Sequence, residues 1–227
     1  MSEKKISVAI DGPSGAGKST VAKALAKRFR LVYVDTGAIY RTVGLAAQRA
    51  DVSSKDADAV IALLPGLQID IAYDAEGTQC MLLNGEDVSE EIRTPKSSIY
   101  ASDVSAIPAV RAFLMDMQRG MAERYSVVMD GRDIGTVVLP KADLKIFLTA
   151  SAEERARRRY NELQQRGSVA SFAEVLRDIE YRDLQDSTRA AAPLKPAEDA
   201  VFIDSSHLSF DESVEAAAKL VREKLGE

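Results

Sequence analysis

The residues best suited to chemistry lie close together near the amino terminus. The segment Asp11–Thr20 reads DGPSGAGKST and fits the pattern G-x-x-x-x-G-K-[ST] without a gap. Backbone N–H groups of such a glycine-rich loop surround phosphate, its lysine reaches the β- and γ-phosphates, and its hydroxyl ligates Mg²⁺. The sequence therefore predicts a polyphosphate site with Lys18 exposed to the phosphates and Ser19 on the metal. The loop residues are Gly12, Pro13, Ser14, Gly15, Ala16, Gly17, Lys18, Ser19 and Thr20.

Such a loop needs a strand before it and a helix after it. Ile6, Val8 and Ile10 form an apolar run typical of a strand, and Val21 and Leu25 begin a helical spacing that starts near Lys18. A helix N-terminus aimed at the loop adds positive dipole charge to the same point. The plainer alternative is a glycine-rich turn that only caps a helix.

Two further strands are predicted to end in polar residues. The run 31–34 leads into Thr36, Tyr40 and Arg41, and the run 126–129 leads into Arg132 and Asp133. Ligands of open α/β sheets gather beyond the carboxyl ends of strands, so these side chains are candidates for one ligand site. An arginine there can bind a phosphate, and a carboxylate there can orient Mg²⁺ through water. The alternatives are a packed Tyr40 and salt-bridged surface turns.

An arginine-rich pair of helices follows. A helix is expected from Ser151 with a capping box to Glu154, and Glu153–Arg157 and Glu154–Arg158 are expected as i,i+4 pairs. Residues 155–159 hold more arginines than such pairs require, which indicates contact with an anion; Arg155 and Arg158 are the candidates. A second helix over 171–186 places Arg182, Asp186 and Arg189 on one face. The span 151–190 is therefore predicted to be a lid.

The middle of the chain changes from helical to alternating periodicity. Leu67, Ile69, Ile71 and Tyr73 alternate with polar or small residues, and the hairpin signal Asn84-Gly85 follows a second run over 78–83. Alternation and turns of this kind predict a three-stranded antiparallel meander. We interpret residues 64–94 as an insertion within a subdomain over 38–110, the whole chain 1–227 being one domain. Later strands are expected at 144–148 and 200–203, and a last helix from Ser209 with Leu225 facing inward.

Composition limits the class of protein. The chain has 227 residues, 46% of them hydrophobic, and a formal net charge of −5, which argues against a nucleic-acid binder. The single cysteine and single histidine, Cys80 and His207, leave no material for a disulfide, a Cys/His zinc site or a His-centred triad. Neither a signal peptide nor a membrane span is recognisable. We expect a cytoplasmic monomer that binds small molecules and not nucleic acid or membrane.

Taken together, these stretches resemble the bacterial cytidylate kinases over essentially the whole length. The motifs are DGPSGAGKST at 11–20, DTGAIYR at 35–41, NGEDVSEEIRT at 84–94, DGRDIGTVV at 130–138, SAEERARRR at 151–159 and RDLQDSTRAAAPL at 182–194. The resemblance implies an α/β P-loop NTPase three-layer fold with a five-stranded parallel core sheet. It also implies a monophosphate-binding domain enlarged by the antiparallel β insertion, and a helical lid.

The resemblance further implies a reaction and a set of site residues. ATP with Mg²⁺ would be the phosphoryl donor, and CMP or dCMP the acceptor. Residues implied at the transfer are Lys18, Arg132, Asp133, Arg155, Arg158 and Arg189. Arg41, Arg132 and Arg189 would hold the acceptor phosphate, with Thr36 in the same loop as Arg41; Ser102, Arg111 and Asp133 would meet the cytosine, and Tyr40, Arg182 and Asp186 the ribose. Ser102 and Arg111 rest on resemblance alone.

The sequence alone leaves three alternative functions open. A kinase of the same fold could act on another small acceptor, such as UMP or shikimate. A regulatory P-loop GTPase should carry an N-K-x-D base-reading motif, which the chain lacks. A structural protein with a vestigial loop would not need an intact Lys18 or several arginine sites.

Overall fold

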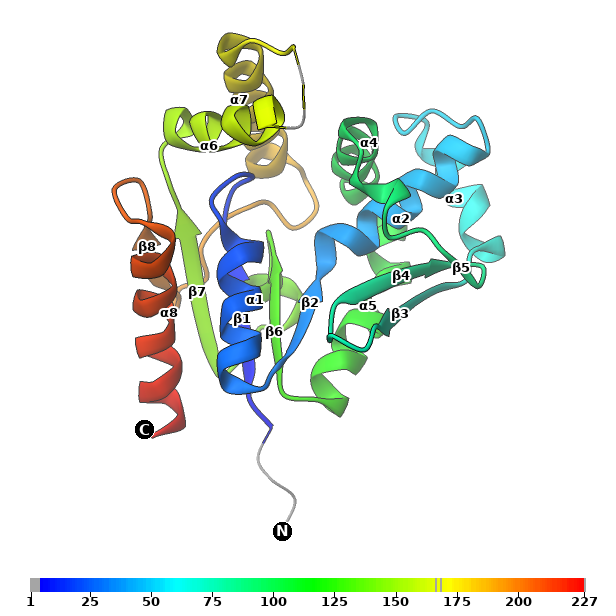
Figure 1. The fold of residues 1–227 in the computed structure, drawn as a ribbon. Helices are drawn as coiled ribbons and strands as arrows, with labels where there is room; N and C mark the ends of the chain where they lie inside the picture. The colour runs from blue at the N-terminus through cyan, green and yellow to red at the C-terminus, as the bar shows by residue number, and fades with distance from the viewer. Residues whose placement is uncertain (1–4, 166, 168, 227) are drawn as a thin grey trace. The chain divides into compact units, whose positions relative to one another are not determined.

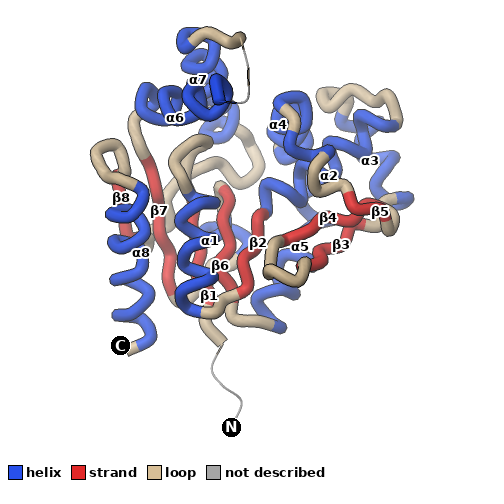
Figure 2. Tube along the Cα trace, in the orientation of Figure 1, coloured by secondary structure: helices blue, strands red, loops and turns tan. Residues whose placement is uncertain are grey.

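The computed structural model describes residues 5–165, 167 and 169–226. The chain forms two compact units, one from residues 1–31 with 126–227 and one from residues 32–125. We call them the first and second unit. Figure 1 shows the chain from blue at the amino terminus to red at the carboxyl terminus, and Figure 2 shows the same view coloured by secondary structure.

The first unit consists of strands, helices and one π-helical turn: β1 (Ser7–Asp11), α1 (Lys18–Phe29), β6 (Val127–Gly131), the π-helical turn η3 (Ile134–Val138), β7 (Leu144–Thr149), α6 (Ala152–Gln165), α7 (Phe172–Thr188), β8 (Val201–Asp204) and α8 (Phe210–Leu225). The second unit consists of β2 (Val32–Asp35), α2 (Thr36–Arg49), α3 (Ala57–Leu63), η1 (Leu64–Gly66), β3 (Ile69–Tyr73), β4 (Gln79–Leu83), β5 (Glu86–Asp87), η2 (Glu91–Arg93), α4 (Pro95–Ser105) and α5 (Pro108–Arg124).

A five-stranded sheet has the order β2-β6-β1-β7-β8. Strand β1 runs parallel to β6, with Ser7 opposite Val127, and parallel to β7, with Val8 opposite Leu144. Strands β7 and β8 are parallel as well. Val8 and Ile10 are fully buried, as parallel strands covered on both faces require. The predicted core sheet is confirmed.

Helices α1 and α8 pack against each other in the first unit, and α8 also lies against β7 (Figure 1). Ala217, Ala218 and Val221 are fully buried on α8. The predicted capping box is present, because the Ser209 hydroxyl accepts a hydrogen bond from the Glu212 backbone and the Glu212 carboxylate binds the Ser209 N–H. The prediction that Leu225 faces inward is wrong: Leu225 is 42% exposed, because it is the last residue of the helix, directly before the cap Gly226.

The predicted meander is a three-stranded antiparallel sheet of β3, β4 and β5 in the second unit. Ile69 lies opposite Leu83 and Tyr73 opposite Gln79. Asn84 and Gly85 both have positive φ, 51° and 83°, as a two-residue type I′ hairpin requires. The antiparallel part of the fold-class prediction is therefore confirmed.

Two helices of the second unit, α3 and α4, were not predicted. Helix α4 has a clear start, because Pro95 follows Thr94 and the Thr94 hydroxyl accepts the Ser97 N–H at 3.0 Å. Helix α2 approaches α4 closely at Gly44, where a Cβ would lie 2.8 Å from the Cβ of Tyr100. Only a glycine allows this approach.

Helices α6 and α7 pack side by side in the first unit through Ala156, Val175 and Ile179. Only half of the box predicted at Ser151 forms. The Ser151 hydroxyl accepts the Glu154 N–H at 3.2 Å, but the Ser151 N–H donates to the Ser206 hydroxyl instead. The predicted Glu154–Arg158 pair is confirmed at 3.3 Å, but the predicted Glu153–Arg157 pair is wrong, because Arg157 pairs with Glu154 at 3.5 Å instead. Within the described chain, no helix is both long and apolar enough to cross a bilayer.

Candidate active site

The loop between β1 and α1 has the backbone shape of a phosphate site. Gly12, Gly15 and Gly17 have φ values of 151°, 78° and 88°, which residues with a Cβ rarely adopt. At Gly12 a Cβ would also lie 1.9 Å from the Leu148 carbonyl oxygen. Three glycines and the start of α1 at Lys18 therefore give a loop whose N–H groups can surround an anion.

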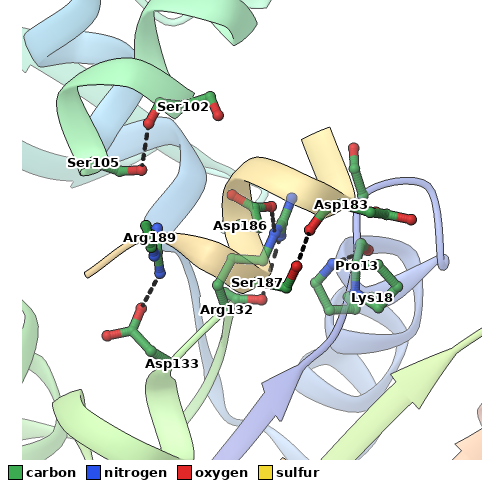
Figure 3. A network of polar contacts seen from close by, with 12 residues as sticks. Pro13, Lys18, Ser102, Ser105, Arg132, Asp133, Asp183, Asp186, Ser187 and Arg189 are labelled. Carbon is green, nitrogen blue, oxygen red and sulfur yellow. Dashed lines mark hydrogen bonds and ion pairs between the residues drawn. The ribbon is translucent and has the colours of Figure 1, made fainter. Parts of the chain in front are cut away.

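Lys18 curls back over this loop and donates to the Pro13 carbonyl oxygen at 2.7 Å (Figure 3). The prediction of an exposed lysine is wrong, since only 5% of Lys18 is exposed. Burial and the positive charge of Arg132 together lower the pKa of Lys18 to about 7, although the nearby carboxylates of Asp130, Asp186 and Asp11 act in the opposite direction. The hydrogen bond to Pro13 fixes the position of Nζ beside the loop.

The Ser19 hydroxyl and the Asp130 carboxylate, the two kinds of group that a P-loop protein offers to Mg²⁺, lie next to each other. The Ser19 hydroxyl donates to Asp130 Oδ2 at 2.9 Å, and Asp130 is a buried residue at the end of β6. One hydroxyl and one carboxylate fit Mg²⁺, which keeps several waters and takes its remaining ligands from phosphates. Among the described residues no group of three or more His, Cys, Asp or Glu could hold a metal ion by itself.

Arg132 and Asp186 form an ion pair close to Lys18. Arg132 Nε donates to Asp186 Oδ2 at 2.6 Å, and the side chains are 21% and 8% exposed (Figure 3). Burial acts to raise the pKa of Asp186, but Arg132, Arg189 and Arg182 outweigh it and the pKa falls below its usual range. Two of the predicted residues therefore meet although they are far apart in sequence.

Asp133 and Arg189 form a second pair, with 3.3 Å between Arg189 Nη2 and Asp133 Oδ1 (Figure 3). Both side chains are at least 94% buried. The predicted helical face including Arg189 is wrong, because α7 ends at Thr188 and Arg189 has an extended ψ of 139°. Its Nε instead donates to the Ala192 carbonyl at 2.8 Å, which turns the guanidinium toward Asp133.

Asp11 connects the phosphate loop to the segment that carries Arg132 and Asp133. Its carboxylate accepts the N–H groups of Ile134 and Gly135, both at 2.7 Å. These amides begin the π-helical turn η3, which directly follows Asp133. Burial raises the pKa of Asp11 to about 6 in spite of these two hydrogen bonds.

The two arginines that the sequence assigned to a lid, Arg155 and Arg158, have different surroundings. Arg155 is 4% exposed and binds the Ser14 carbonyl and Asp183. The Arg158 side chain is 32% exposed and binds Glu154 and the carbonyl of Ser205. A Cβ at Gly17 would lie 4.0 Å from Arg158 Nη1, so this guanidinium borders the phosphate loop.

The remaining predicted residues belong to the second unit. Thr36 is the first residue of α2, whose cap Asp35 accepts the Ala38 N–H at 2.9 Å and pairs with Arg41 at 3.0 Å. The Arg111 guanidinium lies over the Tyr40 ring, 5.6 Å from its centroid.

Arg111 also donates to the Ser105 carbonyl at 3.3 Å, and the Ser105 hydroxyl donates to the Ser102 carbonyl at 2.8 Å (Figure 3). The structure therefore groups Tyr40, Ser102 and Arg111 within this unit. Ser105, Asp11 and Asp183 were missed by sequence reasoning. Their contacts reach distant segments or backbone carbonyls, for which no local pattern exists.

A parallel sheet whose first strand ends in a G-x-x-x-x-G-K-S loop, with Lys18 and the Ser19–Asp130 pair beside the loop, defines a P-loop protein of the class that binds nucleoside triphosphates. A solved structure of an uncharacterized protein from Eubacterium ventriosum shares the fold, with a TM-score of 0.50 and 13% identity over 95% of this chain and 97% of that chain.

The chain belongs to the cytidylate kinase family, whose model matches residues 8–223. The cytidylate kinase of Caldicellulosiruptor saccharolyticus is 48% identical over 98% of each chain. That of Desulforamulus reducens is 53% identical over 94% of this chain and 95% of its own. The predicted family is confirmed, and a UMP kinase is not favoured.

Proposed function

We propose that this protein transfers the γ-phosphoryl group of ATP to CMP or dCMP and releases ADP with CDP or dCDP. Membership of the cytidylate kinase family, together with an intact phosphate loop, supports the proposal. The single observation that carries it is the arrangement of Lys18, Arg132 and Asp186 beside that loop. Because an acceptor phosphate is already an ionised nucleophile, positioning and charge neutralisation are the main tasks of the protein.

Gly12 to Thr20 bind the triphosphate of ATP in this proposal. Lys18 exchanges the Pro13 carbonyl for phosphate oxygens, since its Nζ already lies at the mouth of the loop. Ser19 and Asp130 are the residues that would hold Mg²⁺ beside the loop. The metal supplies positive charge to the β- and γ-phosphate oxygens when it is bound.

Arg132 and Arg189 bind the acceptor phosphate, and Asp133 accepts a hydrogen bond from the N4 amine of cytosine. Arg182 and Asp186 bind the ribose. Buried carboxylates hold both phosphate-binding guanidiniums in position, which lowers the entropic cost of binding.

From the second unit, the family resemblance assigns Thr36, Tyr40, Arg41, Ser102 and Arg111 to the same acceptor. Arg111 is fixed by Tyr40 and Ser105, as a residue that reads a base requires.

Water is the competing acceptor in this reaction, so we include a lid over residues 151–190 in the proposal. Arg158 is the lid arginine that we assign to the phosphates, since it borders Gly17 and is partly exposed. The same proposal includes a monomeric enzyme. It also places the enzyme in the cytoplasm, where its substrates ATP and nucleoside monophosphates are used.

The test is a coupled ADP-release assay over CMP, dCMP, UMP, AMP and GMP with MgATP. We expect turnover with CMP and dCMP that exceeds turnover with UMP by roughly tenfold or more, because unmatched polar partners cost about 1–3 kcal/mol. Lys18→Met is the control for contaminating kinases and should remove the signal. Equal rates with every acceptor, or a signal that survives in the control, would refute the proposal.

A further inference from the structure

Arg155 uses most of its hydrogen-bond donors within the protein. It lies on α6 and is 4% exposed. Nε donates to the Ala150 carbonyl at 2.8 Å, Nη1 to the Ser14 carbonyl at 3.0 Å and to Asp183 Oδ1 at 2.9 Å, and Nη2 to Asp183 Oδ2 at 2.5 Å. Four of the five N–H groups of this guanidinium are therefore already used by the protein.

These contacts join three segments at one point. Ala150 directly follows strand β7, Asp183 lies on helix α7, and Ser14 lies in the phosphate loop. Asp183 takes the guanidinium with both carboxylate oxygens, the strongest geometry available to this pair. Arg155 thus connects helices α6 and α7 to the backbone of the phosphate loop. Figure 1 shows both helices next to the loop that joins β1 to α1.

Gly15 provides an independent observation of the same connection. Its φ is 78°, and a Cβ there would lie 3.2 Å from the Cβ of Arg155 and 3.6 Å from Cδ1 of Ile179. Helices α6 and α7 therefore pack directly on the loop backbone beside the Ser14 carbonyl. A shift of either helix would change the directions of the loop N–H groups.

The other arginines of α6 do not share these surroundings. The side chains of Arg157, Arg158 and Arg159 are 65%, 32% and 34% exposed. Arg157 and Arg159 pair with glutamates of the same helix, Glu154 and Glu162. Exposure distinguishes all three arginines from Arg155. Arg158 also binds across elements, to Ser205, but its side chain stays one-third exposed, whereas Arg155 is buried.

We propose that Arg155 is a positioning residue that fixes the phosphate loop to the lid, and that it does not bind the phosphates itself. It acts through the Ser14 carbonyl, and Asp183 is the partner that holds it there. The inference rests on the proposed use of this loop for ATP. It departs from the sequence-based expectation that Arg155 contacts the transferred phosphate.

The two roles predict opposite effects for one substitution, Asp183→Asn. If Asp183 positions Arg155, losing the forked ion pair loosens the loop and raises the Kd for ATP. If Arg155 binds phosphate, losing its competing carboxylate leaves the Kd unchanged or lowers it. A charge-assisted hydrogen bond corresponds to roughly a tenfold change in Kd.

The experiment measures the Kd for MgATP by titration calorimetry without acceptor, and KM and kcat for both substrates, in Asp183→Asn, Arg155→Lys and the double variant. We expect both single variants to raise the Kd and KM for ATP by about tenfold and to change the KM for CMP by less than twofold. The double variant should be no worse than either single variant, because both remove one unit. Arg157→Lys on the same helix is the matched control and should behave like the wild type.

Asp183→Glu, which keeps the charge but displaces the carboxylate, replaces Asp183→Asn if the latter does not fold. An unchanged or lowered Kd for ATP in the folded Asp183 variant would overturn the proposal. Additive effects in the double variant would overturn it as well. Binding of ATP by the wild type without turnover of CMP would refute the proposed function and leave this inference intact.

Discussion

Asp11 is a buried carboxyl group whose titration should be visible in the stability of the protein. It is 4% exposed and accepts two backbone N–H groups, yet burial raises its pKa from 3.8 to about 6. The folded state therefore holds this proton more tightly than the unfolded state. The stabilisation is fully present below the unfolded pKa and is lost as the pH rises through the folded value.

The size of the effect follows from the two pKa values. A shift from 3.8 to about 6 is roughly two pKa units, and each unit corresponds to about 1.4 kcal/mol. Because pH 4 already lies just above the unfolded pKa, Asp11 should contribute about 2.5 kcal/mol less stability at pH 7 than at pH 4. This is a large share of the roughly 5–15 kcal/mol by which domains are stable.

The measurement compares urea unfolding of the wild type and Asp11→Asn between pH 4 and pH 7. Asparagine offers one acceptor oxygen for the two N–H groups, so the variant should lose about 1–3 kcal/mol for a reason that does not depend on pH. The difference in unfolding free energy, wild type minus variant, should then fall by about 2.5 kcal/mol as the pH rises from 4 to 7. Asp70→Asn, at an exposed residue of β3, controls for the lost charge. A constant difference across this range would refute the reasoning.

Three further predictions concern the proposed active site. Lys18→Met should abolish turnover but lower the free energy of unfolding by only about 1 kcal/mol, the value of the hydrogen bond to Pro13. The ADP-release assay measures turnover and thermal unfolding measures stability. Near-normal turnover would contradict the assignment of the phosphate loop. Arg132→Lys and Arg189→Lys should raise the KM for CMP at least tenfold and leave the KM for ATP within about twofold, and equal damage to both would place these arginines on the donor side. Asp133→Asn should narrow the preference for CMP over UMP, because its amide can donate to uracil O4, and an unchanged ratio of kcat/KM values would mean that Asp133 does not read the base.

The sequence was informative where one local pattern determines one element. Apolar runs ending in glycine or aspartate located β1 and β6, and alternation with Asn84-Gly85 located the antiparallel sheet. The capping box at Ser209 could be predicted for the same reason, since both of its hydrogen bonds lie within four residues. At Ser151 the same pattern failed, because Ser206 from a distant segment supplied a competing acceptor.

Burial and long-range pairing could not be predicted. The pattern around Lys18 specifies a lysine but not that its ammonium bends back to Pro13. Arg155 and Asp183 are separated by 28 positions, and the third partner is a backbone carbonyl, which every residue possesses. Several arginines in one helix therefore predict that an anion could bind there. They do not predict which guanidinium has donors that the protein itself does not already use.

In the first unit, the geometry of the carboxylate partner determines whether an arginine can still bind an anion. Asp186 contacts Arg132 end-on through Nε, and Arg132 Nη1 is 3.4 Å from the Gly131 carbonyl, a long and weak hydrogen bond. Arg132 can therefore keep Asp186 and still turn its terminal N–H groups to a phosphate. Asp183 occupies both terminal nitrogens of Arg155 at once. A phosphate would have to displace this carboxylate and the Ser14 carbonyl to reach Arg155, so fixed and substrate-binding arginines can be distinguished by how their carboxylates hold them.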